Sequence, residues 1–220
     1  MSGHSVLFMT TLTGCSWDMA KFEVCCHKFA DLSEHGYGVS ILNDSKYGFA
    51  TCGNLMRLSL LRAPKAPDAH ADMGRHYIRW AILPHHGDLG PTTVRTAFNF
   101  NNPMKLLQGD TKVDKASVRH ELPIRLTGSP SLILDTVKRG EDDEDVSRGE
   151  LAKRKGRSII LRIYDSLGGT SKGTIETTLD VKKVWKTNVL EDDLEPMSIE
   201  KGKVEICLRP FEVATFRLQL

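Results

Sequence analysis

Short apolar runs with a period of two constrain this chain more than any other feature. In residues 211–220 (FEVATFRLQL), Ala214, Phe216 and Leu218 would share one face of an extended strand. Gly, Pro, Asn or Asp separates most of the runs, and only residues 103–110 suggest a helical turn. The pattern predicts an all-β chain of the β-sandwich type. The other predicted strands cover residues 22–29, 37–43, 54–62, 76–83, 92–100, 131–137, 157–164, 173–185 and 203–208.

The chain length allows two domains, and a polar stretch suggests where they meet. Residues 103–130 contain three prolines and two glycines, which are typical of a connection. We therefore expect a boundary at about residue 115. Two acidic runs, EDDED at 141–145 and LEDDLEP at 190–196, read as surface loops, with docking of a partner as the alternative.

Composition argues against several classes of partner. The 30 basic residues are nearly balanced by 28 acidic ones, for a net charge of +2. Such a chain lacks the strong positive field that nucleic acids and anionic lipids select, so we expect no nucleic acid and no membrane partner. Five cysteines without regular spacing favour reduced, mostly buried thiols over a disulfide framework. No Lys or Arg precedes the short apolar run near the N-terminus, which argues against a signal peptide.

The string Cys25-Cys26-His27 is the first candidate for chemistry. In a strand, Cys25 and His27 would share a face and could begin a metal site. A second ligand pair at the usual spacing is missing, and free cysteine is among the most buried residue types. Core packing is therefore the preferred interpretation, with a metal site or a reactive thiol as alternatives.

Two further strings place His and Asp close together. In APDAHADMG (66–74), Asp68, His70 and Asp72 alternate, so three potential ligands would lie on one side of an extended segment. Such residues also stabilise turns, and a loop facing a partner domain or a sugar is the favoured interpretation. In LPHHGD (83–88), His86 and Asp88 form an H-x-D pair, which we interpret as a turn.

Several blocks of the sequence closely resemble the β-region of glycoside hydrolase family 38, whose members are α-mannosidases. The similarity is strongest to the cytosolic and fungal vacuolar members. It implies a portion of the mutarotase-like supersandwich over 16–115 and a smaller C-terminal β-sandwich over 116–220, with 1–15 as an atypical segment outside it. The blocks are 17–48 (WDMAKFEVCCHKFADLSEHGYGVSILNDSKYG), 53–76, the Pro84-His85-x-Gly87 string, 134–143, 161–169 and 208–220.

The resemblance implies how the chain would contribute to an enzyme. Intact members hydrolyse terminal α-mannose with retention, using two carboxyl groups and a zinc ion. The zinc motif and the nucleophile belong to an N-terminal catalytic domain that this sequence does not match. The resemblance therefore predicts no catalytic residue, metal ligand or cofactor in this chain. We expect Asp68, His70, Asp72 and Arg75 to contact either the rim of the active site or a neighbouring domain.

The expected partners follow from the same resemblance. They are an α-mannosidase catalytic domain supplied in trans and a mannose-containing oligosaccharide, in the cytoplasm or the vacuole. An apolar surface left open would also favour homo-oligomers. The alternative function is a standalone carbohydrate-binding sandwich, for which Trp80, Trp185, Tyr37 and Tyr77 are candidate stacking residues.

Overall fold

The protein is described here from a computed structural model, which covers residues 23–106, 108, 122–149 and 154–220. The chain divides between Leu107 and Gln108 into two compact units, called here the N-terminal unit and the C-terminal unit. The boundary expected at about residue 115 and the segment 1–15 lie outside the described residues. Antiparallel strands dominate both units, which confirms the predicted β-sandwich class. Within the described part of the chain, no helix is long and apolar enough to cross a membrane.

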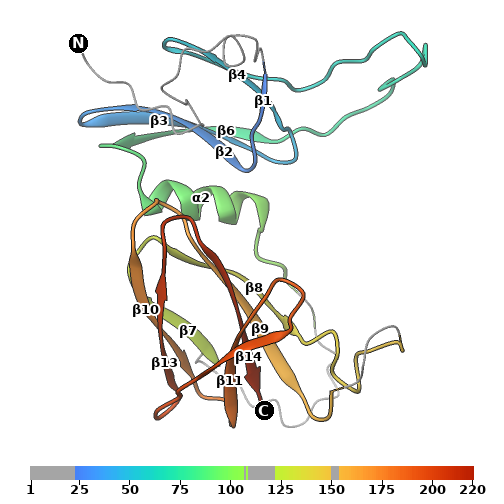
Figure 1. The fold of residues 1–220 in the computed structure, drawn as a ribbon. Helices are drawn as coiled ribbons and strands as arrows, with labels where there is room; N and C mark the ends of the chain where they lie inside the picture. Colours follow the sequence, from blue (N-terminus) through green and yellow to red (C-terminus); the bar gives the residue numbers. More distant parts are fainter. Residues whose placement is uncertain (1–22, 107, 109–121, 150–153) are drawn as a thin grey trace. The chain divides into compact units, whose positions relative to one another are not determined.

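The N-terminal unit contains two three-stranded sheets and one helix (Figure 1). The first sheet has the order β2–β3–β6 and the second the order β1–β4–β5. Figure 1 shows helix α2 on the side of the first sheet that faces away from the second sheet. The elements are β1 (Val24–Cys25), β2 (Phe29–Glu34), β3 (Tyr37–Asn43), β4 (Gly48–Cys52), β5 (Leu55–Leu58), β6 (Trp80–His86) and α2 (Pro91–Asn101).

Two-residue turns at glycine build the hairpins of this unit. Glu34 pairs with Tyr37, so only His35 and Gly36 connect β2 to β3. Gly36 has φ of 88°, a left-handed value that glycine adopts without steric cost. This turn fixes the register that places alternate residues of β2 and β3 on opposite faces of the sheet.

Helix α2 corrects the strand predicted for residues 92–100. Pro91 begins the helix, and Thr93, Val94 and Ala97 are its buried residues, a spacing that matches one helical face. The helix contacts β3, and the Asn101 side-chain amide donates to the Asn43 carbonyl at 2.9 Å. Threonine, valine and phenylalanine favour strands, but burial against the sheet outweighs that preference here.

The C-terminal unit is a β-sandwich of a three-stranded sheet, β13–β10–β7, and a five-stranded sheet, β12–β11–β14–β9–β8. Strand β14 pairs with both β9 and β11, so the C-terminal residues lie inside the larger sheet. The elements are β7 (Ile124–Gly128), β8 (Leu132–Arg139), β9 (Ser158–Asp165), β10 (Ser171–Thr177), β11 (Lys183–Thr187), β12 (Asp193–Met197), β13 (Lys203–Leu208) and β14 (Val213–Gln219).

One hydrophobic core lies between these two sheets. Alternation along β13 buries Val204, Ile206 and Leu208 and exposes the residues between them. From β14, Phe216 and Leu218 enter the same core. The buried members are Leu132, Leu161, Ile163, Ile175, Val184, Val204, Ile206, Leu208, Ala214, Phe216 and Leu218.

Candidate functional site

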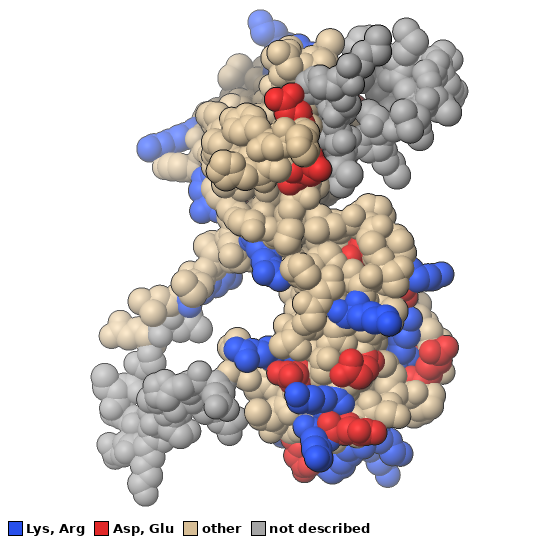
Figure 2. All heavy atoms as spheres, turned by 90° about the vertical axis from the view of Figure 1, so that its left-hand side faces the viewer, with Lys and Arg blue, Asp and Glu red and all other residues tan. Residues whose placement is uncertain are grey.

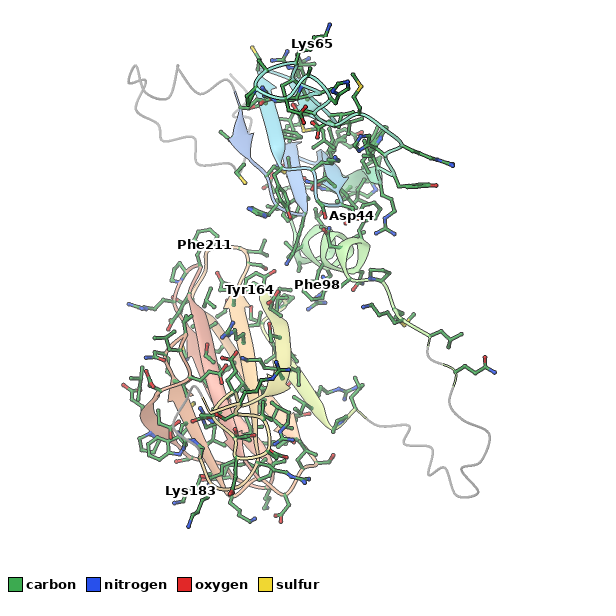
Figure 3. All side chains as sticks on the ribbon, turned by 90° about the vertical axis from the view of Figure 1, so that its right-hand side faces the viewer. Asp44, Lys65, Phe98, Tyr164, Lys183 and Phe211 are labelled. Carbon is green, nitrogen blue, oxygen red and sulfur yellow. The ribbon has the colours of Figure 1, made fainter. Side chains whose placement is uncertain are left out.

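The segment between β5 and β6 holds all four predicted site residues. Residues 59–79 contain no strand, and Figure 1 shows them as a long teal excursion that leaves the sheets and returns to β6. In Figure 3 the label of Lys65 marks this segment. Asp68, His70, Asp72 and Arg75 are all exposed. The segment is therefore an accessible loop, which we call the 59–79 loop.

Local hydrogen bonds shape this loop. The Asp68 carboxylate accepts from the His70 backbone N–H at 2.9 Å, and the Met73 N–H donates to the His70 carbonyl at 3.1 Å. Asp72 has φ of 57°, a left-handed conformation that aspartate tolerates better than most residues. These bonds are typical of turns in which a short polar side chain binds the nearby backbone.

The side chains of Asp68, His70 and Asp72 do not come together as a metal site in the described structure. Asp68 is occupied by a backbone amide, and the Asp72 carbonyl contacts His76 Nε2 at 2.8 Å. Among the residues that the structure describes, no group of three or more His, Cys, Asp or Glu could hold a metal ion. The residues present therefore do not fit a zinc site, and we derive no step through zinc.

Cys25 Sγ and His27 Nε2 lie 3.2 Å apart, although β1 ends at Cys25 and His27 lies in the connection to β2. Both are exposed, so the core interpretation is wrong for this pair. Cys26 points the other way and is fully buried, where burial raises the pKa of its thiol to about 12. Core packing is correct for Cys26 only.

A buried polar cluster on the β2–β3–β6 sheet did not emerge as a site from the sequence. Asp31 is 3% exposed and lies 2.7 Å from His85 Nε2. It also accepts hydrogen bonds from the hydroxyls of Ser33 and Ser40. A Cβ on Gly38 would lie 2.2 Å from His85 Cε1, so glycine makes room for the ring.

The turn interpreted at the H-x-D pair of residues 86–88 is present from Gly87 onwards, and only His86 belongs to the strand instead. Strand β6 continues through His86, and the chain bends only from Gly87, which has φ of 71°. The signal available in the sequence for the buried polar cluster was the alternation of Asp31 with Ser33 and the string Pro84-His85. Neither identifies its partner, because Asp31 and His85 are 54 residues apart.

Three of the four candidate stacking aromatics are exposed. Tyr37 and Trp80 are each 50% exposed, Tyr77 is 81% exposed, and Trp185 is partly buried in β11. The Arg75 guanidinium lies 4.9 Å from the centre of the Tyr77 ring, a cation–π contact within the 59–79 loop. The N-terminal unit therefore combines an aromatic surface with a polar loop.

Figure 2 shows a different surface on the C-terminal unit, where basic and acidic side chains alternate. The sequence analysis interpreted the two acidic runs as surface loops, but each run contains a buried carboxylate. Asp143 is completely buried and Glu191 is 5% exposed. Both belong to a network around Arg217 of β14, which is itself completely buried.

Charge compensation explains how Arg217 occupies a central strand. Its guanidinium donates to Asp142 at 2.7 Å, to the Glu191 carbonyl at 2.7 Å and to the Ser158 hydroxyl at 2.9 Å. Burial alone would raise the pKa of Asp142, but hydrogen bonds from Arg217 and Arg154 outweigh it and the pKa is lowered. Such a network stabilises the sandwich because a lone buried charge would be costly.

Another buried carboxylate, Asp165, anchors a turn. It accepts from the Ser171 hydroxyl at 2.7 Å, from Gly168 N–H at 2.7 Å and from Phe211 N–H at 3.1 Å. Burial raises the pKa of Asp165, yet these hydrogen bonds lower it overall. Asp31, Asp143 and Asp165 are thus all bound by structural partners, which indicates scaffolding.

Comparison with protein families matches both units. The family model described as the glycosyl hydrolases family 38 C-terminal domain matches residues 9–70. The family 38 C-terminal beta sandwich domain matches residues 131–216, within the C-terminal unit.

Curated relatives align along nearly the whole chain. An alpha-mannosidase from Saccharomyces cerevisiae is 49% identical over 213 residues, which are 92% of this chain and 19% of the relative. Alpha-mannosidase G from Dictyostelium discoideum is 35% identical, over 92% of this chain and 18% of its own length. Human alpha-mannosidase 2C1 is 34% identical, over 93% of this chain and 19% of its own length. The chain thus spans about a fifth of these relatives.

A solved structure shares the fold. The crystal structure of an alpha-mannosidase from Enterococcus faecalis V583 superimposes with a TM-score of 0.63 at 17% identity. The match covers 90% of this chain and 21% of that chain.

Proposed function

The chain belongs to the C-terminal region of glycosyl hydrolase family 38, and from this we propose that it serves an α-mannosidase as a non-catalytic β-scaffold. The observation that carries the proposal is the 49% identity to the yeast alpha-mannosidase across both units. In this role the chain would support hydrolysis of terminal α-mannose by a catalytic domain, joined to it or supplied in trans. Its compartment, cytoplasmic or vacuolar, is proposed from the resemblance alone.

The chemistry of glycoside hydrolysis indicates which roles the catalytic domain and this chain would have. A retaining glycosidase needs two carboxyl groups about 5–5.5 Å apart across the scissile bond. Asp31, Asp143 and Asp165 hold neighbouring groups in place, and we assign them no part in that pair. The zinc and both catalytic carboxyl groups would come from the catalytic domain, which leaves positioning and substrate contact to this chain.

We assign the contact role to the 59–79 loop. Asp68, His70, Asp72 and Arg75 are exposed, and within the described structure none of them forms an ion pair. Carboxylate, imidazole and guanidinium groups on an open loop suit hydrogen bonding to the hydroxyls of a mannose-containing oligosaccharide or to a neighbouring domain.

The test replaces the matched segment of the yeast relative with this chain and measures hydrolysis of a chromogenic α-mannoside. We expect the chimera to be active and the purified chain alone to be inactive, with or without added zinc. Turnover by the folded chain alone, abolished by a chelator, would overturn the scaffold role. An inactive but correctly folded chimera would count equally against it.

The loop assignment has its own test within the same chimera. We expect Asp68→Ala and Asp72→Ala to lower kcat/KM without changing the melting temperature. Asp180→Ala is the matched control, because Asp180 is an exposed aspartate that belongs to the C-terminal unit and not to this loop. If kcat/KM stays unchanged in both loop variants, the loop has no such role.

A second candidate function is binding of carbohydrate by the chain alone, and the exposure of Tyr37, Tyr77 and Trp80 favours it. Aromatic rings on a surface can stack against sugar rings. Titration of the chain with a mannose oligosaccharide distinguishes this function, because it predicts binding that Tyr77→Ala or Trp80→Ala removes.

A further inference from the structure

One face of the β2–β3–β6 sheet is covered over part of its width only. Ile41 of β3 and Ala30 of β2 lie directly opposite each other and belong to the core cluster formed with Phe49 of the second sheet. On the other side of Ile41, Ile82 of β6 is its direct partner, yet Ile82 is 59% exposed. The second sheet therefore covers β2 and β3 and leaves β6 open.

The strand register extends this open area. Trp80, Ile82 and Pro84 alternate along β6 and share a face, and Tyr37 of β3 pairs with His86 on that same face. Trp80 and Tyr37 are each half exposed. We call Tyr37, Trp80, Ile82 and Pro84 the open face. It combines large apolar side chains in an arrangement that a monomeric protein normally covers.

Strand β6 is also an edge strand, protected by Pro84, which lacks a backbone N–H, but not by charge. In the described structure it pairs only with β3, and its sequence WAILPHH contains no Lys, Arg, Asp or Glu. The edge strands of the C-terminal unit differ, since β13 carries Lys203 and Glu205 and β12 carries Asp193 and Glu195. Charges on an edge strand prevent unwanted pairing, so an edge without them suits a partner strand.

We propose that the open face and the β6 edge bind the rest of an α-mannosidase polypeptide, that is, the part to which this chain does not align. This inference rests on the proposed function and names the surface through which it would operate. The occupant follows from the comparisons: the same fold makes up 19% of the yeast relative and 21% of the E. faecalis chain, so each continues into a much larger protein.

The chemistry of the open face favours a polypeptide over a sugar. Tyr37, Trp80, Ile82 and Pro84 together offer one hydroxyl and one indole N–H, and His86 beside Tyr37 adds one imidazole. Ile82 and Pro84, at the centre of the face, add only apolar side chains, whereas sugar recognition needs several placed polar groups. An extended strand from the partner would satisfy the free backbone groups of β6, and apolar side chains beside that strand would cover Ile82 and Trp80.

Hydrogen exchange in the yeast chimera tests the docking directly. We expect the β6 amides that do not pair with β3 to exchange at least about tenfold more slowly in the chimera than in the free chain. Strand β13 is the control and should exchange equally in both. Equal exchange of β6 in the two proteins would overturn the proposal.

A charge on the open face provides the second measurement. We expect Ile82→Asp to abolish co-purification of this chain with the remaining four fifths of the yeast relative, expressed as a separate polypeptide. Val137→Asp is the control, because Val137 is exposed on β8 of the C-terminal unit. Co-purification that is equal for wild type and Ile82→Asp would contradict the assigned surface.

Other occupants give different results. Sedimentation of the free chain as a dimer that Ile82→Asp dissociates would assign the face to a second copy and overturn the proposal. Protection of β6 by a mannose oligosaccharide would assign it to sugar and also overturn it. Activity separates the two hypotheses: an active chimera with unprotected β6 removes the docking surface, and a protected β6 without activity removes the proposed function.

Discussion

The two units differ in the size of their hydrophobic core clusters. In the described structure, the core cluster of the C-terminal unit contains eleven buried residues, whereas that of the N-terminal unit contains Cys26, Ala30 and Phe49. The C-terminal unit also covers its larger sheet with charged loops neutralised by Arg217. The N-terminal unit leaves Trp80 and Ile82 exposed. The comparison indicates that the C-terminal unit has the larger hydrophobic core, although it too leaves large apolar side chains such as Leu190 and Phe211 exposed.

Removing one phenylalanine from each core tests this difference most severely. Phe49 and Phe216 are both fully buried, and Phe→Ala costs about 3–5 kcal/mol in a packed core. We expect Phe216→Ala to leave a folded but destabilised C-terminal unit and Phe49→Ala to unfold the N-terminal unit. Hydrogen exchange resolved by peptide measures each unit separately. A folded N-terminal unit in Phe49→Ala would show that its small core suffices.

The next largest effect is expected at Arg217. Replacing it by leucine removes the buried cation from Asp142 and Asp193, which keep only the partly exposed Arg154. Breaking a buried pair costs about 3–5 kcal/mol, and Arg154 makes the lower end of that range the expected loss. Urea unfolding should show a loss confined to the C-terminal unit. Arg125→Leu is the control, because Arg125 is exposed on β7. A loss of similar size in the control would mean that the network contributes little.

Most strands of the sandwich were predictable from sequence, because period-two alternation determines which residues of β8, β9, β13 and β14 face its core. Strands β7 and β12 were missed, since they lie in polar stretches interpreted as a connection and a loop, and β10 and β11 were predicted as one strand. The helix over residues 91–101 was not predictable, since Thr93 and Val94 favour strands and only their burial in the N-terminal unit selects a helix. A local pattern is a weak guide wherever tertiary contacts oppose it.

Charged groups show a second limit of sequence analysis. Asp142 reaches Arg217 across 75 residues, and nothing in the EDDED run indicates which arginine neutralises it. The 59–79 loop, in contrast, was recognisable as exposed, because alternating Asp and His between prolines rarely enter a core. Its predicted contact role remains a prediction.

Replacing the buried Asp31 is expected to have an intermediate effect on the stability of the N-terminal unit. Asp31→Asn would place an amide donor against the donors of Ser33 and Ser40, and an unsatisfied buried group costs about 1–3 kcal/mol. We expect this loss in thermal unfolding of the N-terminal unit. Asp44→Asn is the matched control, because its ion pair with Arg79 is partly exposed and should contribute less than about 1 kcal/mol. Equal losses would contradict a special role for the buried cluster.

The smallest expected effect is a pH dependence confined to the C-terminal unit. Hydrogen bonding from the Arg209 backbone N–H, opposed by burial and aided by Lys186, lowers the pKa of Glu212 from 4.5 to about 2. Because the folded state lowers this pKa, the ionised carboxylate stabilises the unit fully above about pH 4.5, and the stabilisation is lost as the pH falls towards 2. Glu212→Gln should therefore cost about 1–2 kcal/mol at pH 7 and less at pH 3, since glutamine retains an acceptor but no charge. Urea unfolding of both proteins at the two pH values measures the difference, and a cost that is the same at both would show that the charge of Glu212 does not stabilise the sandwich.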